Sequence, residues 1–181
     1  KPIHEEIGKR REREKYEGAF VFQPTPGLYE NLATFDFTSM YSSVIVSFNL
    51  SLSTLRAKKE PNSIEVELEN NKKVYFSQKK SIFATLLEEI IVKRKKYKEE
   101  LKKNFSPITK ARSNAFKLLA NASYGYQGFF GARYYCPEAA ASTAALARKF
   151  LKETIDKINK EGYKVIYADT DSVAFSLANK T

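Results

Sequence analysis

Three aspartates in this sequence are placed where a metal-binding carboxylate would be expected. Asp36 ends an apolar stretch, and Asp169 and Asp171 flank a single threonine between two further apolar stretches. An ionised carboxylate at the end of a buried strand is costly unless it has a partner. If these strands are neighbours, three carboxylates meet at one point, and such oxygen ligands suit Mg²⁺, which completes its shell with waters and phosphates. Asp-Thr-Asp alone is explained more simply as turn chemistry, because aspartate is common in turns.

Cationic side chains form two stripes that suit a phosphate ligand. Arg94 and Lys98 are four residues apart, and Lys117, Asn121 and Tyr124 follow one another at i, i+4 and i+7. Each set therefore shares one face of a helix. Two such stripes facing each other would grip a triphosphate through charge-assisted hydrogen bonds. Each stripe by itself is explained more simply as a solvated lysine-rich face.

The overall charge indicates a polyanionic partner. Lys and Arg number 31 against 21 Asp and Glu, so the 181 residues carry a net charge of +10. Residues 93–103 alone hold seven basic and two acidic side chains. A basic surface releases condensed counterions when it binds nucleic acid. Solvated lysines on an ordinary protein surface explain the charge equally well, so charge alone does not decide between them.

Composition excludes several classes of protein. No apolar run approaches the roughly 18 to 20 residues that cross a bilayer. A single cysteine, Cys136, excludes an internal disulfide and a cysteine-based zinc cluster, which suits a reducing compartment. The single histidine, His4, gives little support to a Ser-His-Asp catalytic triad. The only methionine is Met40, so we expect the chain to be part of a longer protein.

Short apolar stretches predict the strands of an antiparallel sheet. Four stretches are bounded by turn residues, and they cover residues 19–22, 32–37, 164–168 and 172–177. The second is mostly apolar, so we expect it to be buried. Residues 64–76 alternate apolar and acidic side chains around Asn70-Asn71, which predicts a separate hairpin.

Apolar side chains at helical spacing predict four helices, over residues 42–52, 82–104, 107 to about 124, and 137 to about 161. Ser106-Pro107 supplies an N-cap and a first-turn proline, so the middle two form an antiparallel hairpin ending at Tyr124-Gly125-Tyr126. Gly162 is the expected stop of the last helix. Residues 1–17, with six basic and five acidic side chains, predict a surface helix or an extended lead-in. The predicted fold is α+β: an antiparallel sheet with packed helices and a projecting two-helix hairpin.

Four short segments together carry a family resemblance. Residues 36–45 are DFTSMYSSVI, residues 117–125 are KLLANASYG, residues 167–172 are YADTDS, and residues 16–19 are YEGA. The first three resemble motifs A, B and C of family B (alpha-like) DNA polymerases. The last resembles the Tyr-x-Gly-Gly/Ala element that joins the exonuclease and polymerase parts in that family. Three motifs in the right order and with similar spacers make the resemblance specific.

The segments depart from the family pattern at four positions. Met40, Ser42 and Val44 stand where Leu, Pro and Ile are usual, and Ala122 stands where Ser is usual. None of these changes removes a charged ligand, so the chain is not expected to be an inactivated copy. Serine in place of proline is expected to loosen the turn that positions Tyr41.

The resemblance implies a site for template-directed DNA synthesis. It implies that Asp36 and Asp171, with the Phe37 carbonyl oxygen, hold two Mg²⁺ ions, and that Asp169 is a third catalytic carboxylate close by. The implied nucleotide-binding residues are Arg94, Lys98, Lys117, Asn121, Ser39, Met40 and Tyr41, with Tyr41 as the steric gate against a 2′-hydroxyl. The implied DNA-binding residues are Tyr124, Gly125, Tyr16 and Gly18, with Tyr124 at the minor-groove edge of the nascent pair.

The resemblance also implies how the chain is organised. Residues 1–17 lead in from the exonuclease side, residues 18–76 form the first part of the palm with a hairpin insertion at about 64–76, residues 77–126 form the fingers helices, and residues 127–181 form the second part of the palm. The implied partners are primer–template DNA, deoxynucleoside triphosphates, the exonuclease, N-terminal and thumb parts of the polymerase, and a sliding clamp, with no membrane. The general look of the sequence is archaeal, which implies a cytoplasmic, nucleoid-associated protein.

Two other classes remain open at this point. A metal-dependent nuclease would use the same carboxylates and would degrade DNA without nucleotides. A non-catalytic nucleic-acid-binding module would keep the palm shape and would bind without Asp36 or Asp171. Primer extension with and without Asp171→Asn separates these classes from a polymerase.

Overall fold

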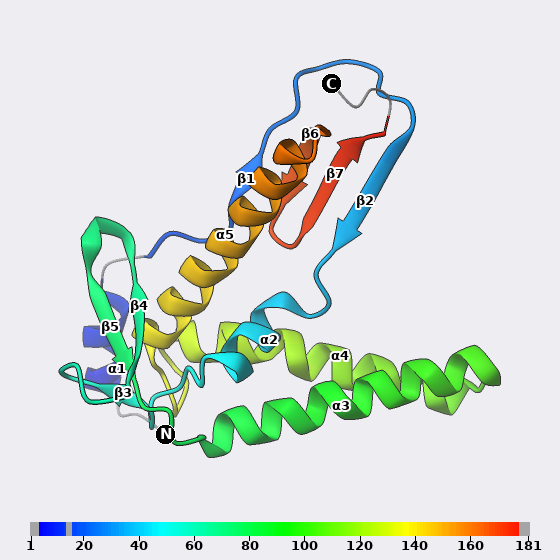
Figure 1. The fold of residues 1–181 in the computed structure, drawn as a ribbon. Helices are drawn as coiled ribbons and strands as arrows, with labels where there is room; N and C mark the ends of the chain where they lie inside the picture. The colour runs from blue at the N-terminus through cyan, green and yellow to red at the C-terminus, as the bar shows by residue number, and fades with distance from the viewer. Residues whose placement is uncertain (1–3, 14–15, 178–181) are drawn as a thin grey trace.

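The computed structural model describes residues 4–13 and 16–177, which form two antiparallel sheets with helices around them (Figure 1). The helices are α1 (His4–Arg11), α2 (Met40–Ser47), α3 (Ile82–Lys103), α4 (Pro107–Gly128) and α5 (Pro137–Lys160), with a 3-10 turn η1 (Glu69–Asn71). The strands are β1 (Val21–Phe22), β2 (Leu32–Asp36), β3 (Leu55–Arg56), β4 (Ile64–Glu67), β5 (Lys73–Phe76), β6 (Lys164–Asp169) and β7 (Ser172–Ser176). The predicted α+β class is confirmed. None of the described helices is long and apolar enough to span a bilayer.

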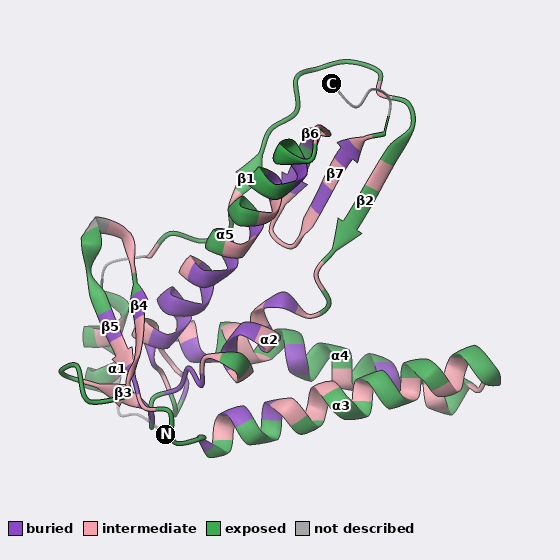
Figure 2. Ribbon diagram, viewed as in Figure 1, coloured by how far each residue is buried: buried purple, intermediate pink, exposed green. Residues whose placement is uncertain are grey.

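The larger sheet has four strands in the order β1-β6-β7-β2, and every neighbouring pair is antiparallel. Helix α5 packs on β6 and β7 and buries its apolar stripe there (Figures 1 and 2). The main core includes Leu146, Leu151, Ile155 and Ile158 of α5 with Val165, Val173 and Phe175 of the sheet. Burial of one such side chain contributes about 1.5–3 kcal/mol, so this interface fixes the strands that carry the motif C aspartates. Gly162 (φ 84°) follows the end of α5, as predicted.

The prediction that the strand at residues 32–37 is buried is wrong. Four of the five residues of β2 are exposed, including Leu32 (43%) and Phe35 (59%). The reason is its position, because β2 is an edge strand that pairs with β7 alone and α5 packs further across the sheet. Figure 2 shows β2 largely exposed beside the buried positions of β7. Apolar content alone does not reveal which strand lies at an edge.

The hairpin predicted at residues 64–76 is present as β4 and β5 joined by η1. A third strand, β3, pairs with the outer side of β5 and completes a small sheet in the order β3-β5-β4. β3 has only two residues, which is too few to show an alternating pattern. Val66, Val74 and Phe76 join the small sheet to the main core.

Helices α3 and α4 form the predicted hairpin, which projects from the rest of the molecule (Figure 1). Ser81 caps α3 by accepting from the Ala84 amide at 3.0 Å, and Ser106 caps α4 by accepting from the Thr109 amide at 3.4 Å. Pro107 occupies the first turn of α4, where its missing amide hydrogen costs nothing. The two caps fix where α3 and α4 begin.

Two predicted helix ends are wrong. The helix predicted over residues 42–52 is α2 and ends at Ser47, because Asn49 takes a left-handed conformation (φ 52°) and the Leu50 amide donates back to the Ile45 carbonyl at 3.0 Å. Helix α4 continues to Gly128, so Tyr124-Gly125-Tyr126 lies inside the helix and not at its end. Gln127 in that last turn is buried, and its carbonyl accepts from the Cys136 amide at 2.9 Å, so tertiary contacts outweigh the cost of a helical glycine.

Candidate active site

Asp36 and Asp171 are brought together at one end of the larger sheet. Asp36 is the last residue of β2 and lies opposite Ser172, the first residue of β7. The Phe37 amide donates to the Asp171 carbonyl oxygen at 2.8 Å, which fixes the backbone of both strands. The turn between β6 and β7 contains Thr170 in a left-handed conformation (φ 54°). The topology therefore places two of the predicted carboxylates, and the backbone of the predicted ligand Phe37, side by side.

The electrostatics of this pair favour a cation. The pKa of Asp171 is raised above its ordinary value, first because the carboxyl is partly buried and then because Asp36 and Asp169 carry like charges nearby. Both effects penalise the ionised form, and a bound positive charge would oppose both. Two adjacent carboxylates are also the ligand type that Mg²⁺ prefers, so the residues present fit a divalent metal.

The Asp169 carboxylate is hydrogen-bonded within its own hairpin. Its Oδ2 accepts from the Tyr167 hydroxyl at 3.0 Å, and its Oδ1 accepts from the Thr170 hydroxyl at 2.7 Å. Among the described residues, no group of three or more histidine, cysteine, aspartate or glutamate side chains is arranged to hold a metal ion. The charge of Asp169 nevertheless contributes to the raised pKa of Asp171. That the three carboxylates converge on one point stays a prediction.

Arg94 links the helical hairpin to the turn that follows Asp36. Its Nη1 donates to Ser39 Oγ at 2.5 Å, and Ser39 itself takes a left-handed conformation (φ 53°) before α2. Met40 next to it is 4% exposed and belongs to the main core. Of the predicted nucleotide-binding residues, the structure thus brings together Arg94 and Ser39, with Met40 buried behind them.

The other residues predicted to bind the triphosphate lie at the same level of the hairpin. Tyr97 of α3 and Phe116 of α4 stack with ring centroids 5.6 Å apart, which sets the register of the two helices. Lys98 and Lys117 are sequence neighbours of this ring pair, and Asn121 follows one turn after Lys117. All three side chains are exposed and accessible to a ligand in solvent.

Three tyrosines from different segments meet beside the aspartates. The rings of Tyr41 and Tyr124 have centroids 4.6 Å apart, and the Tyr124 hydroxyl hydrogen bonds to Tyr16. Burial raises the pKa of Tyr41 and of Tyr124, and the bond to Tyr16 raises that of Tyr124 further. The predicted DNA-binding residues Tyr16 and Tyr124 are thus in contact, and Tyr41 joins them. Gly125 is exposed on α4, with open space where a side chain would begin.

Two residues near this cluster were not identified from the sequence as site residues. Ser42 is 2% exposed, and its hydroxyl donates to the Ala120 carbonyl of α4 at 2.7 Å, so it holds α2 against the hairpin. The prediction that serine here loosens the turn did not anticipate this bond. Arg148 is 6% exposed and donates to the carbonyl of Gly18, the fourth predicted DNA-binding residue. The sequence feature that could have identified Arg148 is its position on the apolar stripe of α5, three residues before Leu151.

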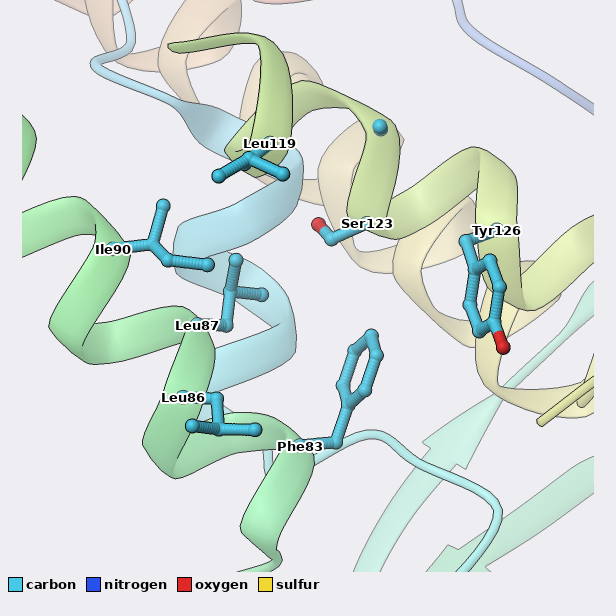
Figure 3. Close-up of a pocket in the computed structure, with 8 residues that line it drawn as sticks. Phe83, Leu86, Leu87, Ile90, Leu119, Ser123 and Tyr126 are labelled. Atoms are coloured by element: carbon cyan, nitrogen blue, oxygen red, sulfur yellow. The ribbon is translucent and has the colours of Figure 1, made fainter. Parts of the chain in front are cut away.

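An apolar pocket of about 290 Å³ lies between α3 and α4, away from these groups (Figure 3). Figure 3 shows Phe83, Leu86, Leu87 and Ile90 of α3 facing Leu119, Ser123 and Tyr126 of α4. On a helix of 3.6 residues per turn, the α4 residues of the pocket are on the face opposite Lys117, Asn121 and Tyr124. The pocket is therefore separate from the candidate site.

The sheet, its paired aspartates and the basic hairpin beside them define an α+β domain with an acidic site suited to a divalent cation. A model of DNA polymerase family B matches residues 3–181. The DNA polymerase of Thermococcus gorgonarius is 37% identical over 177 residues, which cover 94% of this chain and 22% of that protein. DNA polymerase 2 of Aeropyrum pernix is 39% identical over 171 residues (90% and 21%), and the DNA polymerase delta catalytic subunit of Dictyostelium discoideum is 36% identical over 200 residues (99% and 18%).

A solved structure, that of the family B DNA polymerase from the hyperthermophilic archaeon Pyrobaculum calidifontis, matches with a TM-score of 0.71 and 34% identity. The match covers 93% of this chain and 23% of that one. The chain belongs to DNA polymerase family B, as its motifs predicted. It spans about a fifth of the length of the curated relatives named here, among which archaeal polymerases predominate.

Proposed function

We propose that this chain is the nucleotide-adding part of a DNA polymerase, which extends a primer 3′-hydroxyl with deoxynucleotides and releases pyrophosphate. The observation that carries the proposal is the placement of Asp36 and Asp171 beside a basic helical hairpin whose Arg94 reaches the turn after Asp36. Family membership supports it. In this proposal residues 18–76 and 127–181 form the palm, with residues 64–76 inserted, residues 77–126 form the fingers, and residues 1–17 lead in from an exonuclease part.

Asp36 and Asp171, with the Phe37 carbonyl oxygen, are the residues that would hold two Mg²⁺ ions. When bound, the ions supply positive charge at the attacked α-phosphate and a lowered pKa of the primer hydroxyl. The chain itself holds the two carboxylates in register, through the pairing of Asp36 with Ser172 and the bond from the Phe37 amide to the Asp171 carbonyl. Asp169 adds negative charge from its own hairpin and is a bystander to metal binding in this geometry.

The hairpin binds the triphosphate in this proposal. Arg94 already points at the turn of Ser39 and Met40, so a phosphate oxygen arriving there would replace the Ser39 hydroxyl as its acceptor. A charged acceptor makes the stronger bond. Lys98, Lys117 and Asn121 are exposed at the same level and add further donors. Because the hairpin projects from the palm, its inward movement would bring this grip to the carboxylates before chemistry.

The tyrosines read the sugar and the base pair. Tyr41 follows the turn after Asp36, and its ring is placed to clash with a ribose 2′-hydroxyl. Tyr124 packs against Tyr41 in a tilted ring contact and is placed at the minor-groove edge of the nascent pair, where correct pairs present acceptors at similar positions. Gly125, Tyr16 and Gly18 contact the primer–template in the same region. The remaining partners in this proposal are the exonuclease, N-terminal and thumb parts and a sliding clamp.

Primer extension tests the proposal. The polymerase polypeptide that carries this chain is given primer–template, Mg²⁺ and deoxynucleotides, with Asp171→Asn as the matched variant. Nucleotide-dependent extension that is lost in the variant supports a polymerase. DNA degradation without nucleotides that is lost in Asp171→Asn would indicate that this chain is a nuclease, and DNA binding that never leads to a reaction dependent on Asp171 would indicate a binding module.

A further inference from the structure

Arg148 is a buried cation with an unusual set of partners. It lies on α5 with 6% of its surface exposed, and its Nη1 donates to two successive backbone carbonyls, those of Glu17 at 2.6 Å and Gly18 at 2.5 Å. Its guanidinium also pairs with the carboxylates of Glu17, at 3.9 Å, and of Glu69. A buried charge is tolerated only when it is paired and hydrogen-bonded, and Arg148 meets both conditions.

Arg148 and its partners come from three separate parts of the chain. Glu17 and Gly18 lie where the lead-in meets the first part of the palm, Glu69 begins the η1 turn of the β4–β5 hairpin, and Arg148 is on the helix behind the larger sheet. The planar guanidinium has five donors in a fixed fork, so it can bind both carbonyls and a carboxylate at once, whereas a lysine ammonium cannot match that geometry. Arg148 therefore fixes where the lead-in backbone passes the sheet.

Tyr16 immediately precedes Glu17 and Gly18, whose carbonyl oxygens accept from Arg148. Its hydroxyl lies against α4, because a Cβ added at Gly128 would come within 2.7 Å of it. The Tyr16 hydroxyl also hydrogen bonds to Tyr124, whose ring packs against that of Tyr41 at a tilt of 41°, with centroids 4.6 Å apart. A chain of contacts thus runs from Arg148 through Tyr16 to the two tyrosines beside the aspartates.

We propose that Arg148 is a positioning residue for base-pair discrimination, which acts by holding Tyr16 against Tyr124. The inference rests on the proposed function, because it assigns a consequence to the orientation of Tyr124. Arg148 touches neither nucleotide nor DNA in this account. Loss of Arg148 frees the carbonyls of Glu17 and Gly18, Tyr16 moves away from Gly128, and Tyr124 loses the hydrogen bond to Tyr16 that orients its hydroxyl.

The test compares four variants in the polymerase polypeptide that carries this chain. Arg148→Lys keeps the charge but not the planar set of donors, Tyr16→Phe removes the hydroxyl that bonds to Tyr124, and Gly128→Ala displaces the Tyr16 hydroxyl without touching Arg148. The matched control is Lys149→Gln, the next residue on α5, which is exposed and, within the described part of the chain, pairs with Glu153 across one helical turn. For each variant, kcat and KM are measured for the correct and a mismatched nucleotide, together with the melting temperature.

We expect the first three variants each to lower the ratio of correct to mismatched kcat/KM by about tenfold, the effect of one lost hydrogen bond to a charged or buried group. The double variant of Arg148→Lys and Tyr16→Phe should be no worse than the worse single one, because both act through one contact. The control should leave the ratio unchanged. Additive effects in the double variant, or a lower melting temperature with an unchanged ratio, would overturn the inference, since Arg148 would then be a structural anchor alone.

A second measurement separates this inference from the proposed function. Hydrogen exchange in the same polypeptide reports the backbone amides of residues 16–20 without any need for catalysis. Faster exchange in Arg148→Lys, with no change in Lys149→Gln, supports the inference that Arg148 holds this backbone segment, and equal exchange in the two variants overturns it. If the unmodified polypeptide fails to extend a primer, the proposed function fails while the exchange result still decides whether Arg148 holds the lead-in.

Discussion

Replacing Arg94 by alanine is expected to raise the apparent nucleotide Kd by about 10- to 150-fold. Arg94 Nη1 lies 2.5 Å from Ser39 Oγ, so the guanidinium is already held over the turn that follows Asp36. A hydrogen bond to a charged group contributes about 1.5–3 kcal/mol, and each 1.4 kcal/mol is about tenfold in affinity. Primer–template affinity should barely change, because in the proposed function this side chain contacts the nucleotide and not the duplex.

Two controls isolate the role of Arg94. Lys95 is exposed and about 100° further around α3, so Lys95→Ala should weaken DNA binding slightly and in a salt-dependent way, without a nucleotide defect. Ser39→Ala removes the acceptor of Arg94 in the free protein and leaves the guanidinium available, so nucleotide affinity should not fall.

The assay is single-turnover incorporation at increasing nucleotide concentration, with DNA affinity measured separately by fluorescence anisotropy. If Arg94→Ala and Lys95→Ala behave alike in both measurements, α3 is a general basic surface and the proposed triphosphate grip is wrong.

Three further predictions concern the same region and its support. Ser42→Ala should lower the free energy of unfolding by about 1 kcal/mol, or Tm by about 2–4 °C, because it removes the hydrogen bond to the Ala120 carbonyl. The loss is modest because the Ser123 hydroxyl still donates to that carbonyl. An unchanged thermal unfolding curve would show that the Ser42 bond contributes nothing to stability. Tyr41→Ala should raise the ratio of ribonucleotide to deoxyribonucleotide incorporation, and an unchanged ratio would mean that Tyr41 only packs against Tyr124. Burial raises the pKa of the Cys136 thiol to about 11, so at pH 8 the thiol stays protonated. Iodoacetamide should therefore label the native chain at least roughly 100-fold more slowly than the urea-unfolded chain, and equal rates would refute this.

The helices and the motif C hairpin were predictable because their signals are local. Ser106-Pro107 and Gly162 mark helix ends through backbone chemistry that acts within a few residues, and α5 shows an apolar stripe along its length. The exposure of β2 was not predictable, since it depends on which strand lies at the sheet edge. The true end of α4 depends on Gln127 being buried by residues far away in the sequence.

The same distinction between local signals and long-range contacts applies to the candidate site. The aspartates and the cationic stripes were identified from residue type and spacing, and the sheet brings Asp36 and Asp171 together. The position of the Asp169 carboxylate was not predictable, because it is fixed by hydroxyl donors on Tyr167 and Thr170 whose rotamers the sequence does not state. The role of Arg148 was also hidden, because its partners at Glu17 and Gly18 are about 130 residues away along the chain.

The most direct test of the central claim is primer extension by Asp36→Ala and Asp171→Ala, with DNA affinity measured in parallel. Each change removes a proposed metal ligand and leaves every proposed phosphate contact of the hairpin in place. The expected result is a loss of nucleotide addition of at least roughly 100-fold, the effect of one lost electrostatic contact in a transition state, with DNA affinity nearly unchanged. Retention of more than about a hundredth of the activity by either variant would contradict the assignment of these two carboxylates as the catalytic pair.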